Sequence, residues 1–211
     1  MALVGSAPTV LLNPPGLIDG HDIVVRVNNY KLVDGATGSR TDVYYSFFGT
    51  SIRKGRDDLR RDGVTLCLAK CPDAKFMESD WHRRHNRDVG VDYRYIYRQR
   101  SAWWFCDTYV PTLEVFLEKF NLLGGHVPTT GFAALLDLLD FGCRVYLTGF
   151  DFFASRLHNL NEPWRAKNPD DPIRHLPEAE AAWVAGYARA NPDRITLDAP
   201  LQEMFAGVDP A

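Results

Sequence analysis

The chain has 211 residues, 45% of them hydrophobic, which suffices for one domain with a sizeable apolar core. Its formal net charge of −3 argues against a protein whose whole surface is built to bind nucleic acid. No apolar run is long enough to cross a bilayer, and no basic stretch precedes a hydrophobic one at the N-terminus. We therefore expect a cytoplasmic protein with neither a membrane span nor a signal peptide.

Runs of β-branched and aromatic residues predict strands, and apolar residues at helical spacing predict helices. In the helix expected at 131–141, Phe132 begins the apolar face, and Asp137 and Asp140 point outward. In chain order we expect strands at 2–5, 22–27, 41–48 and 63–69, helices at 111–120 and 131–141, a strand at 144–148, a helix at 178–190, a strand at 194–197 and a short helix at 201–205. This alternation predicts an α/β fold, a Rossmann-like, mainly parallel sheet with helices on both faces.

Residues 70–110 carry tryptophans, tyrosines and arginines but little periodicity. We expect them to form an insertion or lid within a single domain that spans residues 1–211. The arginines there would equally suit a solvated, salt-bridged surface. The cysteines are too few and too scattered for a disulfide scaffold, so we expect free thiols at Cys67, Cys71, Cys106 and Cys143.

Two loops of small residues follow predicted strands. Ligands of such sheets bind outside the carboxyl ends of the strands, where the loops 5–8 and 149–153 would lie. Gly5 with Ser6 and Ala7 would let backbone N–H groups approach a ligand, although a plain tight turn explains the same residues. The chain contains neither G-x-G-x-x-G nor the G-x4-G-K-[ST] phosphate loop.

Two further segments carry polar groups at the ends of predicted elements. Asn28 follows the second strand, where its amide could pair with a base or a ribose hydroxyl, or simply form a turn. Thr129, Thr130 and Gly131 open a helix, whose unpaired N–H groups and dipole favour an anion. An ordinary helix cap would explain the threonines as well.

Taken together, these segments resemble the sialylmotifs of glycosyltransferase family 29. The stretch VGSAP…GLIDGHDIVVRVNNY is similar to the large sialylmotif, and PTTGFAALLDLLDFGCRVYLTGFD is similar to the small one. His158 with Glu162 is similar to the short third motif, and His175 with Glu180 fits the H-x4-E pattern of the very small motif. The end of the chain is also similar to bacterial sialyltransferases of family 42.

Departures from the family pattern accompany this resemblance. The asparagine that the family usually has in its first loop is replaced here by Ser6 or Ala7. Animal members have a Golgi membrane anchor and a disulfide between the large and small motifs, and neither feature is evident in this sequence. The resemblance therefore implies a bacterial-type, cytoplasmic enzyme with a single-domain, GT-A-like sialyltransferase fold.

The resemblance implies an inverting transferase whose donor is CMP joined to sialic acid or to the related 2-keto sugar Kdo. His175 would be the general base, since the positive end of a helix dipole favours a neutral imidazole. Glu180 would orient His175 or the helix, and His158 would assist the phosphate leaving group. The residues implied to bind the donor are Gly5, Ser6, Ala7, Asn28, Thr129, Thr130, Gly131, Gly149, Phe150 and Asp151.

No metal or other cofactor is expected. Diphosphate-sugar transferases commonly hold a metal with D-x-D, which this chain lacks, and a CMP donor has one phosphate that hydroxyls, amides and a histidine could stabilise. An anionic glycan or lipopolysaccharide acceptor, at a membrane surface, could be gripped by arginines and tryptophans. The candidates are Arg83, Arg84, Arg87, Trp103 and Trp104.

Two other functions stay open. A nucleotide-binding protein that kept the site but lost catalysis would also carry these segments. A dehydrogenase or methyltransferase fits less well, because the glycine fingerprint is incomplete and the acidic ribose-binding residue is not evident.

Overall fold

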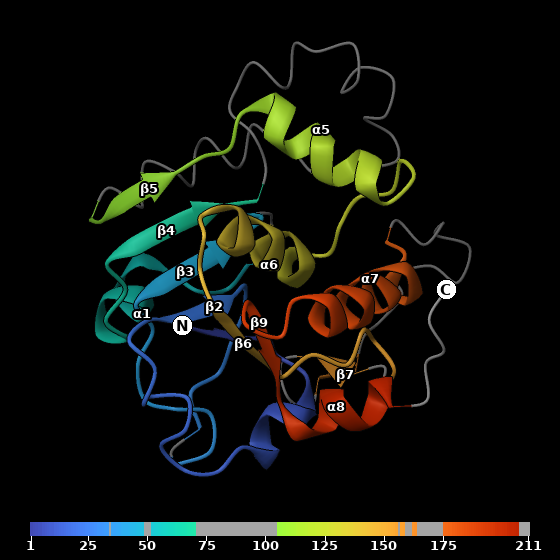
Figure 1. Ribbon diagram of the computed structural model, residues 1–211. Coiled ribbons are helices and arrows are strands. Elements are labelled where there is room, and N and C mark those ends of the chain that lie inside the picture. Colours follow the sequence, from blue (N-terminus) through green and yellow to red (C-terminus); the bar gives the residue numbers. More distant parts are fainter. Residues whose placement is uncertain are drawn as a thin grey trace.

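The β-branched and aromatic runs build one parallel sheet, shown in Figure 1. A computed structural model describes residues 1–33, 35–48, 52–70, 105–155, 157–158, 162–163 and 175–206. Across the sheet the strands lie in the order β5 (Asp107–Tyr109), β4 (Leu66–Ala69), β3 (Val43–Ser46), β2 (Val24–Val27), β1 (Ala2–Val4), β6 (Val145–Thr148) and β9 (Ile195–Leu197). All six pairings are parallel.

The direction in which strands are added to the sheet reverses next to β1. From β1 the chain moves outward through β2 to β5, and then it returns to place β6 on the other side of β1. Val4 at the end of β1 is in register with Arg26 of β2 and with Thr148 of β6. The loops after β1 and β6 therefore leave the same edge of the sheet, at the switch point where doubly wound folds bind ligands.

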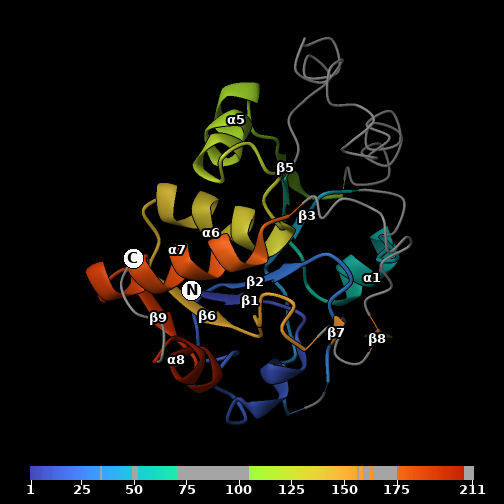
Figure 2. The same cartoon turned by 90° about the vertical axis from the view of Figure 1, so that its right-hand side faces the viewer.

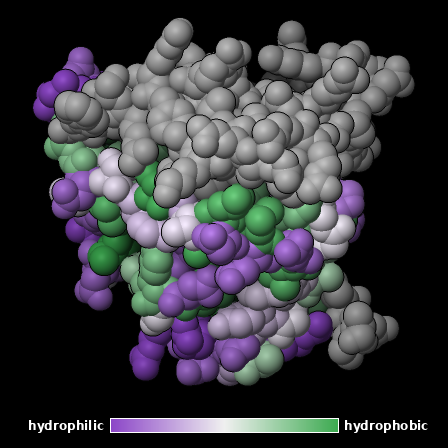
Figure 3. Space-filling model, turned by 90° about the horizontal axis from the view of Figure 1, so that it is seen from above, coloured by the Kyte–Doolittle hydropathy of each residue, from purple (hydrophilic) through white to green (hydrophobic). Residues whose placement is uncertain are grey.

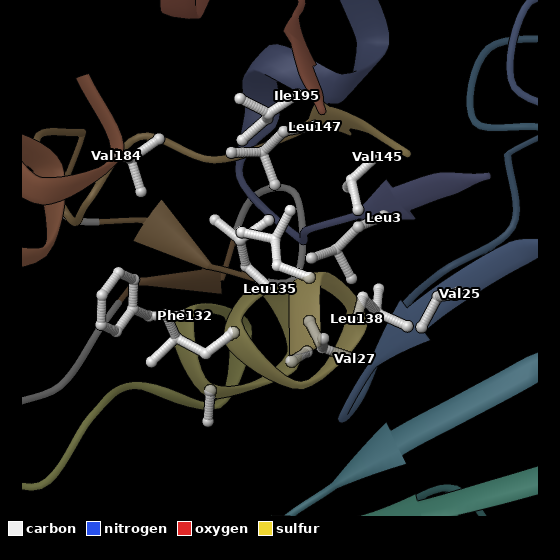
Figure 4. Packing of buried hydrophobic residues seen from close by; sticks show 14 of the residues in the cluster. Leu3, Val25, Val27, Phe132, Leu135, Leu138, Val145, Leu147, Val184 and Ile195 are labelled. Atoms are coloured by element: carbon white, nitrogen blue, oxygen red, sulfur yellow. The ribbon is translucent and has the colours of Figure 1, made fainter. Parts of the chain in front are cut away.

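Side-chain alternation along the strands divides the sheet into two buried faces. On one face, Leu3, Val25 and Leu147 pack against α6 (Thr130–Asp140), α7 (Pro177–Ala190) and α8 (Ala199–Phe205), as Figure 4 shows for α6 and α7. On the other face, residues of the strands pack against η1 (Pro8–Leu12) and α1 (Arg56–Arg61). Figure 2 shows α6 and α7 side by side over the sheet. Burial on both faces explains why the strands β1 to β4 are mainly apolar, with Arg26 and Ser46 as buried polar exceptions.

Helix starts coincide with side chains that cap them. The hydroxyl of Thr112 accepts a hydrogen bond from the Val115 amide and begins α5 (Leu113–Leu122). Thr129 caps α6 in the same way, and the Asp198 carboxylate caps α8. Each cap satisfies an amide that has no partner within its helix. The described surface seen from above mixes hydrophobic and hydrophilic residues (Figure 3).

The predicted fold class is confirmed, since a parallel sheet carries helices on both faces. The predicted strands and helices occur, with bounds that differ by a few residues. The segment predicted as an insertion, 70–110, includes at its end the edge strand β5. A short antiparallel pair, β7 (Leu157–His158) and β8 (Glu162–Pro163), was not predicted, nor were η1 and α1.

The expectation that Asp137 points outward is wrong. Asp137 is 2% exposed, and its carboxylate accepts hydrogen bonds from Lys119 of α5 and from the Tyr45 hydroxyl of β3. A helix between a sheet and a second helix is enclosed on more than one side, which the single-stripe pattern does not reveal. No helix in the described part of the chain has the length and hydropathy to cross a bilayer.

Candidate active site at the switch point of the sheet

The loops after β1 and β6 are held together by their backbones. The Gly5 amide donates to the carbonyl of Thr148 at 2.8 Å, and the Ala7 amide donates to the carbonyl of Gly149 at 2.9 Å. A Cβ on Gly5 would lie 2.2 Å from the Gly149 carbonyl oxygen, closer than any side chain allows. Gly5 is thus required by its contact with Gly149, whereas the sequence suggested that it leaves room for a ligand.

A buried network of hydrogen-bonded polar groups holds the loop after β6 in place. The Thr148 hydroxyl donates to the Asp198 carboxylate at 2.7 Å and accepts from the Asn13 amide at 2.7 Å. The Gly149 amide donates to the same Asp198 oxygen, at 3.2 Å. The network links η1, β6 and α8 at the switch point, and sequence reasoning missed it. The only sequence signal was Asp198 two residues before Pro200, a pattern typical of a helix start.

The turn before α6 is bound to α7 by Glu180. The Thr129 amide donates to Oε1 of Glu180, and the Thr129 hydroxyl donates to Oε2, both at 2.6 Å. The same hydroxyl accepts from the Phe132 amide at 3.2 Å, so its donor and acceptor roles are both used. Glu180 has no exposed surface. The structure thus brings two of the predicted segments together, and it shows Glu180 fixing the turn.

The environment of Glu180 alters its titration. Burial raises the pKa of Glu180 to about 7, while the hydrogen bonds from Thr129 and the charge of Lys70 act in the opposite direction. Lys70 follows β4 and is itself buried. Lys70 was not among the predicted site residues, because a single lysine at the end of a strand carries no distinguishing pattern.

The amides of Thr130 and Gly131 begin α6 and make no hydrogen bond within the described part of the chain. They belong to the helix N-terminus, where unpaired N–H groups and the dipole attract an anion. The ring of Phe150 covers Gly131 so closely that a Cβ there would lie 2.3 Å from the ring. Phe150 thus brings the loop after β6 against the first turn of α6.

His175 lies beside the same turn. Its Nδ1 is 2.6 Å from the carbonyl oxygen of Val127, two residues before Thr129. A carbonyl oxygen can only accept, so Nδ1 must carry the proton of this hydrogen bond. In the neutral imidazole the lone pair therefore resides on Nε2, the nitrogen that can take up a proton. His175 is partly exposed.

Asp151 organises the end of the loop that begins at Gly149. Its carboxylate accepts from the Phe153 amide at 3.0 Å and from the amide and hydroxyl of Ser155. Phe152 and Phe153 both have positive φ, 48° and 63°, which is strained for bulky residues. Asp151 is buried, and its described contacts stabilise this strained loop.

Asn28 immediately follows β2 and has a φ of 49°. Its side-chain oxygen accepts weakly from the Ser46 hydroxyl at 3.3 Å and from the Phe47 amide at 3.4 Å. The side-chain NH₂ group makes no hydrogen bond to the described residues. Asn28 thus joins the adjacent ends of β2 and β3, and among the described residues its NH₂ group has no acceptor.

The remaining predicted residues are less completely described. Ser6 is half-buried in the loop after β1. His158 ends β7, in register with Glu162 of β8, and only its backbone is described. The predicted acceptor residues Arg83, Arg84, Arg87, Trp103 and Trp104 lie outside the described residues. Within the described ranges, no group of three His, Cys, Asp or Glu residues is placed to hold a metal ion.

No protein-family model and no curated protein matches this sequence. Solved structures of sialyltransferases nevertheless share its fold. The sialyltransferase CstII from Campylobacter jejuni, in complex with the substrate analogue CMP-3FNeuAc, aligns with a TM-score of 0.58 and 12% identity, covering 97% of this chain and 84% of that chain. A mammalian sialyltransferase in complex with Gal-beta-1-3GalNAc-ortho-nitrophenol gives 0.56 and 17%, covering 93% and 67%. CstII in complex with a trisaccharide acceptor and CMP gives 0.52 and 12%, covering 98% and 84%. The chain therefore has the fold of sialyltransferases.

Proposed function

We propose that this protein is an inverting glycosyltransferase that transfers sialic acid, or the related sugar Kdo, from a CMP-sugar to a hydroxyl of a glycan. The shared fold supports this proposal, since the similar structures were solved with a CMP-sugar analogue, CMP or glycan acceptors. The local geometry supports it further, because four segments distant in sequence meet at one edge of the sheet. They are the loops 5–7 and 149–151, the turn 127–131 and the segment 175–180.

One observation carries the proposal. Glu180 is hydrogen-bonded to Thr129, 51 positions earlier in the chain, and His175 is hydrogen-bonded to Val127, 48 positions earlier. The H-x4-E segment, which would supply the base, is thus packed on the turn that would hold the donor. A chain that resembled sialyltransferases by chance would have no reason to join these two segments with a fully buried carboxylate.

In the proposed reaction the acceptor hydroxyl gives its proton to Nε2 of His175 and attacks the anomeric carbon of the donor sugar. The bond from that carbon to the phosphate oxygen breaks, and CMP leaves with the electron pair. The hydrogen bond from Nδ1 to Val127 supports this role, because it fixes the ring and the tautomer in which Nε2 is the basic nitrogen. Attack opposite the leaving phosphate inverts the configuration.

The donor phosphate or sugar carboxylate would bind the amides of Thr130 and Gly131 at the start of α6. Thr129 would contribute through its cap, because its own amide and hydroxyl are engaged by Glu180. Asn28 would offer its NH₂ group to the cytidine or ribose, and Ser6, Ala7 and the loop from Gly149 to Asp151 would line the same crevice. His158 is proposed to donate to the leaving phosphate, and the acceptor site is proposed at Arg83, Arg84, Arg87, Trp103 and Trp104.

The decisive experiment follows CMP release from CMP-Neu5Ac and, separately, from CMP-Kdo, with and without lipopolysaccharide-type glycans. We expect one donor to be consumed and His175→Ala to lose at least about 100-fold in turnover, the range for removal of a general base. His21→Ala is the matched control, because His21 stacks on Tyr146, which packs on the face of the sheet opposite α6, and this variant should keep full turnover.

The outcomes separate the alternatives. Release of CMP only from CMP-Kdo would assign the donor sugar to Kdo. CMP-sugar binding without any release of CMP would identify a nucleotide-binding protein that has lost catalysis. Near-normal turnover of His175→Ala would remove the base assignment.

Metal independence is a separate prediction of this proposal. A single phosphate at two helix amides needs no divalent cation to neutralise it, so turnover should be unchanged in excess EDTA. The assay compares initial rates of CMP release with EDTA and with added Mg²⁺ or Mn²⁺. Loss of activity in EDTA that Mn²⁺ restores would contradict it.

A further inference from the structure

Two thiols lie in contact at the edge of the sheet farthest from β9. Sγ of Cys67, on β4, is 3.3 Å from Sγ of Cys106, which immediately precedes β5. Cys67 is in register with Thr108, so Cys106 lies two positions before its opposite residue, on the same face. A disulfide needs the sulfurs about 2.05 Å apart, so they must approach by roughly 1.3 Å. Within the described sheet β5 is an edge strand that pairs with β4 alone, and such a strand can make that shift.

The surroundings of the two sulfurs differ. Cys67 is fully buried in an apolar cluster that includes Tyr44, Leu59 and Phe116. Cys106 is partly exposed at the margin of the same cluster. An oxidant can therefore reach Cys106 first, and Cys67 is already in place to resolve the product.

We propose that Cys67 and Cys106 form a disulfide when the protein meets a low-molecular-weight disulfide such as oxidised glutathione. The Cys106 thiolate attacks one glutathione sulfur, so a mixed disulfide forms and one glutathione leaves as its thiolate. The Cys67 thiolate then attacks the Cys106 sulfur of the mixed disulfide and releases the second glutathione. The two protein thiols lose two protons and two electrons in all, and the oxidant becomes two molecules of glutathione.

Burial is the main reason why the pKa of both thiols is raised, so little thiolate is present near neutral pH. The reaction is therefore slow compared with that of an exposed, activated cysteine. The burial of Cys67 leaves only the Cys106 sulfur open to attack by a reductant, so reduction of the finished bond is also slow. A disulfide with these properties forms during prolonged exposure to an oxidising environment. A rapid peroxide sensor would instead need an exposed thiol with a lowered pKa.

The bond would join β4 to the entry of β5 and close a loop between residues 39 positions apart. Closing a loop of that length restricts the unfolded chain, which stabilises the native state. The expected rise in Tm is on the order of 5–10 °C. This inference does not rest on the proposed transferase activity.

The test incubates the purified full chain with reduced or oxidised glutathione, alkylates the free thiols, and measures intact mass, linked peptides and Tm. We expect oxidation to remove two alkylatable thiols and to give one linked Cys67–Cys106 peptide. We also expect it to raise Tm, and dithiothreitol should reverse that rise. Cys106→Ser should abolish the link, whereas Cys143→Ser, which removes a partly exposed thiol outside this cluster, should retain it.

Three results would overturn the proposal. They are a link from either residue to Cys71 or Cys143, a stable glutathione adduct on Cys106 without a link, and unchanged thiols. Because Cys106 is only partly buried, Cys106→Ser should fold, and its far-ultraviolet circular dichroism checks this independently. If Cys106→Ser misfolds, the linked peptide of the unaltered chain still decides the question.

Discussion

Glu180 has a carboxyl group without solvent contact, and its titration should be measurable in the stability of the protein. Burial raises its pKa from 4.5 to about 7, so between these values the native state binds more protons than the unfolded chain. This group therefore lowers the free energy of unfolding as pH rises from 4.5 to 7, by about 3 kcal/mol in total. Above pH 7 its contribution is constant.

Glu180→Gln should remove that pH dependence. The Gln oxygen can accept from the Thr129 amide, and its NH₂ group can donate to the Thr129 hydroxyl, so both contacts persist. Relative to the unaltered protein, Glu180→Gln should gain about 3 kcal/mol between pH 4.5 and pH 8, as measured by urea unfolding at several pH values. Glu178→Gln, on an exposed position of the same helix, should show no such trend. Parallel pH profiles for all three proteins would mean that Glu180 titrates normally.

Glycines give a second test at this scale, because they differ in what a Cβ would meet. Gly5→Ala would place a methyl group 2.2 Å from the Gly149 carbonyl oxygen. The loops after β1 and β6 can move apart only if the hydrogen bonds between them break. We expect a loss of about 3 kcal/mol or more. Gly186→Ala, within α7 and facing open space, should gain about 1 kcal/mol through helix propensity. Thermal unfolding measures both, and equal effects would contradict the packing argument.

Near Gly5 and Thr129 the sequence indicated residues with special contacts, but it did not indicate which contacts they make. Small residues after a strand are required both by ligand approach and by backbone contact, and only the tertiary neighbour distinguishes the two. The partner of Gly5 lies 144 positions later, at Gly149, and no local pattern predicts that pairing. Asp151 likewise was predicted to line the site, while its described contacts hold its own loop.

At the scale of elements, α5 is joined to α6 and β3 by a buried charged cluster. Lys119, Asp137 and Tyr45 all have less than 5% exposure, and the Tyr45 hydroxyl is 2.5 Å from the Asp137 carboxylate. Lys119→Met would leave the Asp137 charge without its cation, at a cost of about 3–5 kcal/mol. Urea unfolding should show a matching fall in the midpoint.

Replacing the whole cluster should restore most of that loss. Lys119→Met with Asp137→Leu and Tyr45→Phe removes the three described polar partners of the cluster together, so stability should return to that of the unaltered protein or exceed it. Arg61→Met, which removes an exposed guanidinium from its ion pairs with Asp58 and Asp62, should change stability by less than about 1 kcal/mol. If the triple variant is no more stable than Lys119→Met, the cluster does not act as one unit.

The predictable elements were those with long apolar patterns, such as α6 and α7. The elements that were missed are short: α1 has 6 residues and β5 has 3. Such segments bury too few side chains to show a period, and packing against the sheet rather than local propensity stabilises them. Asp137 was misplaced for a related reason, since its partners Lys119 and Tyr45 come from elements whose relative positions a helical wheel does not contain.

At the scale of the whole molecule, the reversal of strand order beside β1 brings the candidate site together. Loops after β1, β2 and β6 open at one edge because these strands are parallel and in register there. The alternation of strands and helices predicted this class of fold, and hence the edge at which a ligand would bind. The alternation did not predict that Glu180 of α7 would be hydrogen-bonded to Thr129 at the start of α6, since a contact between two helices depends on their final packing.

If this edge is a cytidylate pocket, nucleotide binding should stabilise the whole fold. A ligand that binds only the native state at a hundredfold excess over its Kd adds about 2.7 kcal/mol. For a chain of this length that corresponds to a Tm increase of about 5–10 °C. We expect this shift with CMP and a clearly smaller one with AMP, whose purine base is larger, as measured by differential scanning fluorimetry.

Two variants connect that shift to named residues. Asn28→Ala removes the NH₂ donor at the end of β2 and should reduce the CMP shift by at least half. His175→Ala should retain the full shift while it loses turnover, because the proposed base acts on the acceptor hydroxyl and leaves CMP binding unaffected. Equal shifts with CMP and AMP would mean that the site does not distinguish the base. A CMP shift abolished by His175→Ala, with native circular dichroism, would instead place the imidazole in the nucleotide pocket and require another residue as the base.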